Sequence, residues 1–223
     1  MSKYSLPIVD SSDVFSVNKI ICIGRNYAEH AREMGHDPDR EPPFFFFKPQ
    51  SALAQNGEDF HYPHFSRQVE HELELVVAIG KAGTKISAEN AADHVFGFGL
   101  GLDMTCRDIQ KEAKKLGRPW ELAKGFDGSA PCTAIQRGTL SDLEHYGELV
   151  LTRNSNEVQR GNWRDMVWPI PELIAEVSRY VKLEAGDLIF TGTPAGVGPV
   201  QIGDELVARL EGFSQTLKLR MTE

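Results

Sequence analysis

The stretch VEHELELVVAI, residues 69–79, decides how this chain folds. Its aliphatic and β-branched residues predict a strand, and its apolar part is far shorter than the roughly 20 residues of a membrane span. Because side chains alternate between the two faces of a strand, Glu70, Glu72 and Glu74 share one face. The stretch therefore predicts a strand that presents three carboxylates in a row.

Carboxylates two residues apart on a strand lie about 7 Å from one another and oppose one another's ionisation unless a cation lies between them. Their oxygens are hard ligands, which suit Mg²⁺, Mn²⁺ or Ca²⁺ better than zinc. Asp103, at the predicted junction of a strand and a helix, either caps that helix or completes a three-carboxylate site with Glu72 and Glu74. The alternative is an ordinary exposed strand with one solvated polar face, and the residues alone leave both interpretations open.

The segments around this strand predict an α+β fold. In VFGFGLGL, residues 95–102, three glycines alternate with bulky residues, which predicts a strand whose glycine face packs closely against a neighbour. Thr105 and Asp108 resemble a capping box that would open a helix over 107–116. Further helices are predicted over 26–34, capped by Asn26, and over 171–181, and further strands over 19–24, 44–47, 187–191, 205–210 and 216–221.

The composition fits one domain of a soluble protein over residues 1–223. The chain has 24 Lys plus Arg and 32 Asp plus Glu, so its formal charge is −8, whereas a dedicated nucleic-acid binder needs a basic face. Cys22, Cys106 and Cys132 are an odd and scattered set, which favours a reducing, cytoplasmic setting over a disulfide framework. We expect no signal peptide, no membrane segment and no nucleic-acid partner.

Other side chains with catalytic potential lie outside the carboxylate strand. His30 and Glu33 are three residues apart on the predicted helix 26–34, where a carboxylate can orient an imidazole and make it a better base, although a solvated pair is the ordinary alternative. Lys124, taken alone, indicates a surface charge in a loop. The polar, proline-rich segment 35–43 predicts an exposed and mobile loop.

Two familiar motifs are excluded. The sequence HEL at 71–73 begins like the zinc-protease motif HExxH, but Leu75 stands where the second histidine is required. The alternating glycines of 95–102 lack the third glycine and the following acidic residue of a dinucleotide-binding fingerprint. We therefore expect neither a zinc protease nor a dinucleotide-binding enzyme.

A series of short motifs in a fixed order carries a resemblance to a known family. The motifs are GRNYAEHARE at 24–33, FKP at 47–49, HELEL at 71–75, LDMT at 102–105, LAKGFD at 122–127 and TGTP at 191–194. With them the chain resembles the fumarylacetoacetate hydrolase family over nearly its whole length, and more narrowly its acylpyruvase and fumarylpyruvate hydrolase branch. The stretch MGHDPDREPP at 34–43 leans toward the bacterial fumarylpyruvate hydrolases.

The resemblance implies a mixed β-roll with flanking helices, a mobile N-terminal lid over about residues 26–43, and assembly as a homodimer. It also implies one divalent cation, Mg²⁺ or Mn²⁺ with Ca²⁺ as a substitute in a crystal, held by Glu72, Glu74 and Asp103. Glu70 falls outside this ligand set and would be either an outer group or a surface residue.

The same resemblance implies roles in catalysis and in substrate binding. His30 and Glu33 match the water-activating dyad of the family, and Lys124 matches the lysine that faces the reacting carbonyl. Further residues match positions of the substrate pocket: Arg25, Tyr27, Lys48, Gln110 and Thr193.

The implied activity is metal-dependent hydrolysis of a C–C bond in 2,4-dioxo acids, the acylpyruvates, within aromatic catabolism. Fumarylpyruvate, which would yield fumarate and pyruvate, is the expected substrate. The leaving group is the enolate of pyruvate, which the cation and Lys124 would stabilise. The alternatives are an oxaloacetate decarboxylase that forms the same enolate, a dienoate isomerase or hydratase, and a metal-binding relative without activity.

Overall fold

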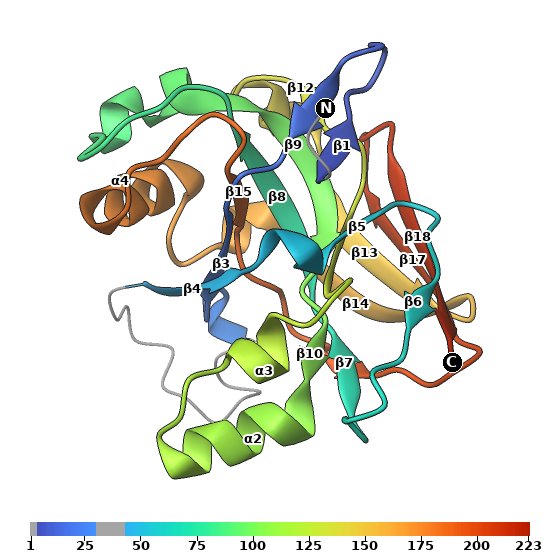
Figure 1. Ribbon diagram of the computed structural model, residues 1–223. Helices are drawn as coiled ribbons and strands as arrows, with labels where there is room; N and C mark the ends of the chain where they lie inside the picture. Colours follow the sequence, from blue (N-terminus) through green and yellow to red (C-terminus); the bar gives the residue numbers. More distant parts are fainter. Residues whose placement is uncertain (1–3, 30–42) are drawn as a thin grey trace.

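A computed structural model describes residues 4–29 and 43–223 and has a large mixed sheet at its centre (Figure 1). The strands of this sheet pair in the order β4 (Phe44–Lys48), β3 (Ile20–Gly24), β15 (Leu188–Phe190), β8 (Leu73–Ile79), β9 (Val95–Leu102), β11 (Ala130–Cys132) and β5 (Leu53–Gln55), and β12 (Gln136–Arg137) also pairs with β9. Parallel and antiparallel pairs both occur, since β15 is parallel to β3 and antiparallel to β8. The predicted α+β class with a mixed sheet is confirmed.

Smaller sheets in the same described ranges complete the β-structure. One has the order β14 (Asn156–Asn162), β13 (Glu148–Arg153), β17 (Glu205–Leu210), β18 (Thr216–Thr222) and β6 (Phe60–His61). Another joins β10 (Thr105–Cys106), β7 (Val69–His71) and β16 (Gly198–Pro199), and a hairpin joins β1 (Ser5–Pro7) to β2 (Val14–Ser16). The short sheet around β7 lies next to the start of β8, where the candidate ligands are found.

The helices flank the central sheet. In Figure 1, α2 (Arg107–Leu116) and α3 (Glu121–Lys124) lie together at its lower end, and α4 (Ile170–Tyr180) lies at its left. The 3₁₀ helices are η1 (Gln50–Ala52), η2 (Ala88–His94), η3 (Asp142–His145) and η4 (Trp163–Asp165). Within the described residues, no helix has the length and apolar character required to cross a membrane.

Strand β8 is buried on both faces. Leu73, Leu75 and Val77 belong to one hydrophobic core, which they share with residues of the five-stranded sheet. Val76 and Ala78 belong to a second core, which includes residues of the N-terminal hairpin. Because side chains alternate along a strand, the face that carries Glu74 also carries Val76, and this carboxylate is therefore directed into the protein.

The close packing predicted for the glycine face of β9 is confirmed. A Cβ atom on Gly97 would lie 2.1 Å from the carbonyl oxygen of Gln136. A Cβ atom on Gly101 would lie 2.4 Å from the ring of Phe190. A side chain at Gly97 would therefore collide with the backbone of a neighbouring strand, and one at Gly101 would collide with the Phe190 ring.

The strand predicted over 69–79 differs from the structure in one respect, because it is interrupted at Glu72. β7 pairs with β10 and β16, whereas β8 pairs with β9 and β15. The chain changes sheets at this residue, so Glu72 lies at the corner between two sheets.

The capping box predicted for helix α2 differs from the structure. Helix α2 begins at the predicted residue, but it has no side-chain cap, and the Thr105 hydroxyl donates instead to the carbonyl oxygen of Asp103 at 3.0 Å. Thr side chains hydrogen-bond nearby backbone groups in several ways, and here a local bond replaces the cap. The Asn26 amide donates to the carbonyl oxygens of Thr191 and Trp168, at 2.8 and 3.1 Å. The Asn26 cap belongs to the predicted helix over 26–34, which lies largely outside the described residues.

Some predictions concern residues 30–42, which lie outside the described ranges. The predicted helix over 26–34 and the lid over about 26–43 lie largely there. The dyad His30 and Glu33 lies there entirely. These remain predictions.

Candidate metal and substrate site

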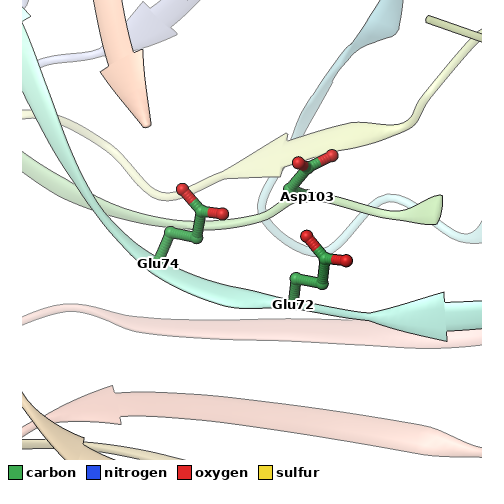
Figure 2. Close-up of side chains that lie close together, drawn as sticks. All are labelled: Glu72, Glu74 and Asp103. Carbon is green, nitrogen blue, oxygen red and sulfur yellow. The ribbon is translucent and has the colours of Figure 1, made fainter. Parts of the chain in front are cut away.

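The carboxylates of Glu72, Glu74 and Asp103 come together at one end of the central sheet (Figure 2). In the antiparallel pairing of β8 with β9, Leu73 lies opposite Leu102, which places the next residue, Asp103, beside Glu72. The Asp103 amide donates to the Glu72 carbonyl oxygen at 2.9 Å. Each residue offers an oxygen, and these oxygens all lie within 4.8 Å of one another.

This carboxylate group is buried. The exposed fractions are 6% for Glu72, 1% for Glu74 and 1% for Asp103, and Glu70 is only 9% exposed. The interpretation of this strand as an exposed one with a solvated polar face is therefore wrong. Its charged face is enclosed by helices and loops that the local sequence pattern does not show.

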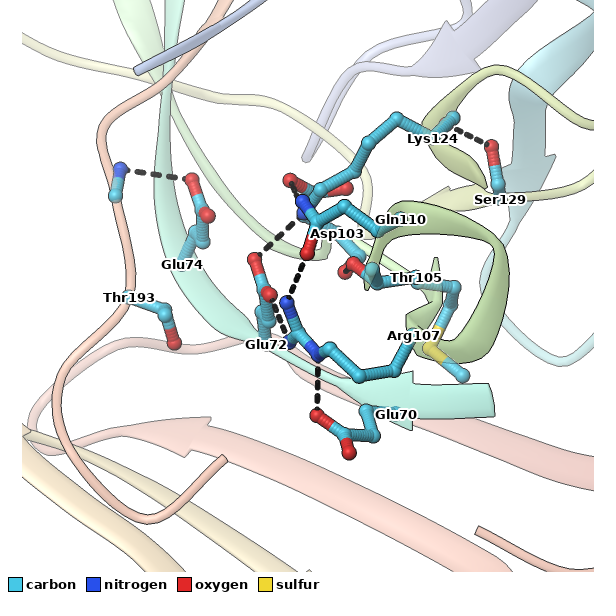
Figure 3. A network of polar contacts seen from close by, with 12 residues as sticks. Glu70, Glu72, Glu74, Asp103, Thr105, Arg107, Gln110, Lys124, Ser129 and Thr193 are labelled. Atoms are coloured by element: carbon cyan, nitrogen blue, oxygen red, sulfur yellow. Dashed lines mark hydrogen bonds and ion pairs between the residues drawn. The ribbon is translucent and has the colours of Figure 1, made fainter. Parts of the chain in front are cut away.

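Lys124 supplies positive charge directly to two of the carboxylates (Figure 3). Its ammonium nitrogen lies 2.8 Å from Glu72 Oε2 and 2.7 Å from Asp103 Oδ2. Burial acts to lower the pKa of Lys124, but the carboxylates of Asp103 and Glu72 outweigh it and raise the pKa to about 12. Lys124 ends the short helix α3 and is buried, so its interpretation as a surface charge in a loop is wrong.

Arg107 is a second buried cation of the site and is not among the residues predicted from the sequence. Its guanidinium bonds Glu70 Oε2 at 2.6 Å and Glu72 Oε1 at 2.5 Å, and it donates to Gln110 Oε1 at 2.6 Å. Glu70 is thus an outer group that holds Arg107 against Glu72. The available signal was the position of Arg107, four residues after Asp103 at the start of a helix.

Lys48 is a third buried cation and contacts Asp103. Its ammonium nitrogen is 2.8 Å from Asp103 Oδ1, and it donates to the Met104 and Ser129 carbonyl oxygens at 3.2 and 3.1 Å and to the Lys124 carbonyl oxygen. These contacts join the segment that carries Asp103 to the one that carries Lys124. Lys48 therefore fixes the relative position of a candidate ligand and of the buried lysine.

The donor set fits a hard divalent cation. Within the described ranges, Asp103 Oδ1 has an ion pair but no hydrogen-bond partner, although it is fully enclosed. Burial, together with the charges of Asp103 and Glu72, raises the pKa of Glu74 well above its ordinary value of 4.5. A divalent cation would remove both penalties, and an all-carboxylate set suits Mg²⁺ or Mn²⁺.

A cavity opens beside these carboxylates. Its wall includes the predicted substrate residues Arg25, Gln110 and Thr193, as well as the three candidate ligands, Arg107 and Lys124. Tyr27 and Lys48 are not part of this wall. Tyr27 is buried, its hydroxyl has no hydrogen-bond partner among the described residues, and burial and the charge of Glu74 raise its pKa.

The TGTP segment, whose Thr193 lines the cavity, is held by a hydrogen-bond network around Gln159. The Gln159 amide donates to Thr193 Oγ1 at 3.0 Å and to the Pro194 carbonyl oxygen at 3.1 Å. Its oxygen accepts from the Leu73 amide at 3.0 Å and lies 2.9 Å from His71 Nδ1. Gln159 therefore ties this segment to the strand that carries the ligands, which the sequence analysis did not predict.

Gly192 in the same segment contacts a ligand directly. Its amide donates to Glu74 Oε2 at 2.8 Å, and its φ of 99° lies in the region that favours glycine. A Cβ atom here would also lie 2.7 Å from the Cβ of Asn26. The glycine thus permits the backbone to approach the carboxylate.

Comparison with known proteins identifies relatives along nearly the whole chain. The family described as fumarylacetoacetate (FAA) hydrolase C-terminal matches residues 19–218. The mitochondrial oxaloacetate tautomerase FAHD1 of Bos taurus is 44% identical over 92% of this chain and 92% of its own, and the Escherichia coli oxaloacetate tautomerase YcgM is 40% identical over 92% and 94%. The crystal structure of fumarylpyruvate hydrolase from Pseudomonas aeruginosa in complex with Mn²⁺ and pyruvate superposes with a TM-score of 0.92, at 42% identity over 98% of this chain and 95% of that one.

These matches cover far more than half of the chain, and its motifs occur in the order described above. The relatives are hydrolases and tautomerases, and one of them holds a divalent cation. This chain belongs to the fumarylacetoacetate hydrolase family.

Proposed function

We propose that this protein is a divalent-metal-dependent hydrolase that cleaves a C–C bond in acylpyruvates, with fumarylpyruvate as its first substrate. The observation that carries the proposal is the buried group of Glu72, Glu74 and Asp103, with the Lys124 ammonium bonded to two of them at the wall of a cavity. The structural similarity to a fumarylpyruvate hydrolase with Mn²⁺ and pyruvate supports it.

The charges of the site favour an anionic substrate. The buried groups are four carboxylates, of Glu70, Glu72, Glu74 and Asp103, and three cations, of Lys48, Arg107 and Lys124. Their formal charges sum to −1, and a divalent cation brings the sum to +1. Arg25 and Lys114 add positive charge at the wall of the cavity, where a substrate carboxylate would be attracted.

Glu72, Glu74 and Asp103 would hold the cation, which when bound supplies Lewis-acid stabilisation of an enolate oxygen. The Lys124 ammonium remains protonated and places a second positive charge beside the carbonyl that becomes the enolate. His30, oriented by Glu33, would take a proton from the water that attacks the C4 carbonyl. The bond between C3 and C4 then breaks, and its electron pair forms the pyruvate enolate.

Oxaloacetate tautomerase is a second candidate, which does not follow from the sequence motifs alone. The relatives at 44% and 40% identity favour it. Oxaloacetate has the same 2-oxo carboxylate end, so the same buried groups would stabilise its enol. Tautomerisation moves a proton at C3 and needs no activated water, and decarboxylation of oxaloacetate would likewise need none.

The candidates are separated by the substrates that the Mn²⁺-loaded protein converts. The assay measures the change in substrate absorbance and the release of pyruvate. It is run separately with fumarylpyruvate, acetylpyruvate, enol oxaloacetate and keto oxaloacetate. We expect fumarylpyruvate cleavage, which Glu33→Gln or His30→Asn lowers by about 10²–10⁴. Rapid interconversion of enol and keto oxaloacetate, without fumarylpyruvate cleavage, would instead establish the tautomerase.

Mutation of the ligands tests the premise that both candidates share. We expect Glu72→Ala and Asp103→Ala to abolish Mn²⁺ binding in calorimetry, and wild-type affinity in both variants would exclude the site.

We also propose that the protein is a homodimer, and light scattering of the purified protein tests this.

A further inference from the structure

Lys114 is a cation of the cavity wall that takes no part in the bond cleavage described above. Arg107, Gln110 and Lys114 lie at positions i, i+3 and i+7 of helix α2, so they share one helix face. Arg107 is at the buried end of this face and holds Glu72, whereas Lys114 lies about 10 Å further along the helix axis. The helix thus presents one cation near the ligands and another toward the mouth of the cavity.

Lys114 differs from the other lysine of the wall in its partners. Lys124 is bonded to two carboxylates, but within the described ranges no carboxylate forms an ion pair with Lys114. Its ammonium nitrogen instead lies 5.1 Å from the centre of the Trp120 ring. The Lys114 side chain is exposed to solvent, and partial desolvation of its ammonium, followed by the nearby charges of Arg107 and Arg25, lowers its pKa from the ordinary value of 10.5. A carboxylate at this point would relieve the repulsion among these cations.

An aromatic wall separates the two lysines. The Trp120 ring packs edge-on against Phe44 and Phe46, with ring centres 5.6 and 5.9 Å apart. Phe46 in turn lies 5.2 Å from the ammonium nitrogen of Lys124. The wall therefore passes from a charged end at the carboxylates, through an apolar middle, to a second positive charge at Lys114.

We propose that Lys114 binds the distal carboxylate of a dicarboxylic 2-oxo acid, whose apolar middle lies along Phe44, Phe46 and Trp120. The proposal rests on the proposed function, because it places the 2-oxo carboxylate end at Glu72, Glu74 and Asp103. It narrows the substrate class to acids that carry a second carboxylate at the far end of the carbon chain. Lys114 then determines specificity and takes no part in bond cleavage.

Two acids of equal length test the proposal by binding alone. 2-Oxoadipate has a distal carboxylate and 2-oxohexanoate has a methyl group in its place, and neither has the C4 carbonyl that cleavage requires. Their affinities for the Mn²⁺-loaded protein are measured by calorimetry. We expect Lys114→Met to weaken 2-oxoadipate about tenfold and to leave 2-oxohexanoate unchanged, because only the first acid loses a charge partner.

Two control variants show whether an effect of Lys114→Met comes from the loss of its charge at this position. Lys111→Met removes an exposed lysine of the same helix that is not part of the cavity wall, and we expect it to change neither affinity. Lys114→Arg keeps the charge and should retain the preference for 2-oxoadipate. Equal weakening of both acids by Lys114→Met, or no weakening, would overturn the role of Lys114 alone. Failure of both acids to bind the wild-type protein would overturn the proposed function as well.

Discussion

The ammonium nitrogen of Lys124 lies 2.7 Å from Oδ2 of Asp103, and both side chains are almost completely buried. Without Lys124, two buried carboxylates would lose their shared counter-charge. We expect Lys124→Met to destabilise the metal-free protein by about 3–5 kcal/mol, as measured by urea unfolding. Saturating Mn²⁺ should restore part of this loss, because it binds only the folded protein.

The same variant tests the catalytic role of this lysine. With Mn²⁺ bound and the fold verified, we expect kcat on fumarylpyruvate to fall by about 10²–10³. Lys115→Met, at an exposed position of α2, serves as the control and should retain wild-type stability and rate. Wild-type turnover in Lys124→Met would remove Lys124 from the mechanism.

Binding of Mn²⁺ is expected to strengthen as the pH rises, because of Glu74. Burial and the charges of Asp103 and Glu72 raise the pKa of Glu74, so the metal-free protein favours its protonated form and must release a proton to bind the cation. The free energy of unfolding of the metal-free protein changes with pH in the opposite direction. Protonated Glu74 favours the metal-free fold at low pH, and this contribution is lost as the pH rises from 4.5 through the raised pKa.

Calorimetry of Mn²⁺ binding in buffers with different ionisation enthalpies measures the released proton directly. Glu74→Gln removes the titrating group and should weaken Mn²⁺ binding while also flattening its pH dependence. If the variant kept the wild-type slope of affinity against pH, another group would be responsible for proton release.

The local pattern predicts the strands and the ligands, but not how they are enclosed. The alternation in residues 69–79 and the glycines of 95–102 fix the two strands, since each pattern is a property of neighbouring residues. The pairing of Leu73 with Leu102 then brings Asp103 to Glu72, which the residues alone left open beside a helix cap and which the family resemblance implied. Local patterns contain no information about register between distant strands.

The unpredicted parts of the site are all long-range contacts. Gln159 lies 86 residues from Leu73 in the chain and is nevertheless bonded to its amide. The sequence around Arg107 indicates only an arginine in an amphipathic helix. Its ion pair with Glu72 depends on the corner at that residue, where the chain changes sheets. The family resemblance assigns Lys48 to the substrate pocket, but its bonds to the surrounding carbonyl groups follow only from the structure.

Gly101→Ala is expected to destabilise the fold. A Cβ atom there would lie 2.4 Å from the Phe190 ring and 2.8 Å from Val76 Cγ2, and both of these side chains are fully buried. We expect a loss of about 1–3 kcal/mol in the free energy of unfolding, which is typical of overpacking. Gly198→Ala is the control, because its nearest neighbour would lie at 3.7 Å, and it should change the free energy by well under half of that amount.

Gln159→Met tests whether the Gln159 side chain positions the TGTP segment at the cavity. The Gln159 side chain bonds Thr193 and the Leu73 amide, and methionine of similar volume leaves the buried amide without this partner, at a cost of about 1–3 kcal/mol. Thr193 loses one bond but still donates to the Leu73 carbonyl oxygen at 2.8 Å. Because Thr193 lines the cavity, we expect the KM for fumarylpyruvate to rise about tenfold while kcat changes less. Gln201→Met, at an exposed position, should alter neither constant. A lower unfolding temperature with unchanged KM would show that Gln159 stabilises the fold without positioning the site.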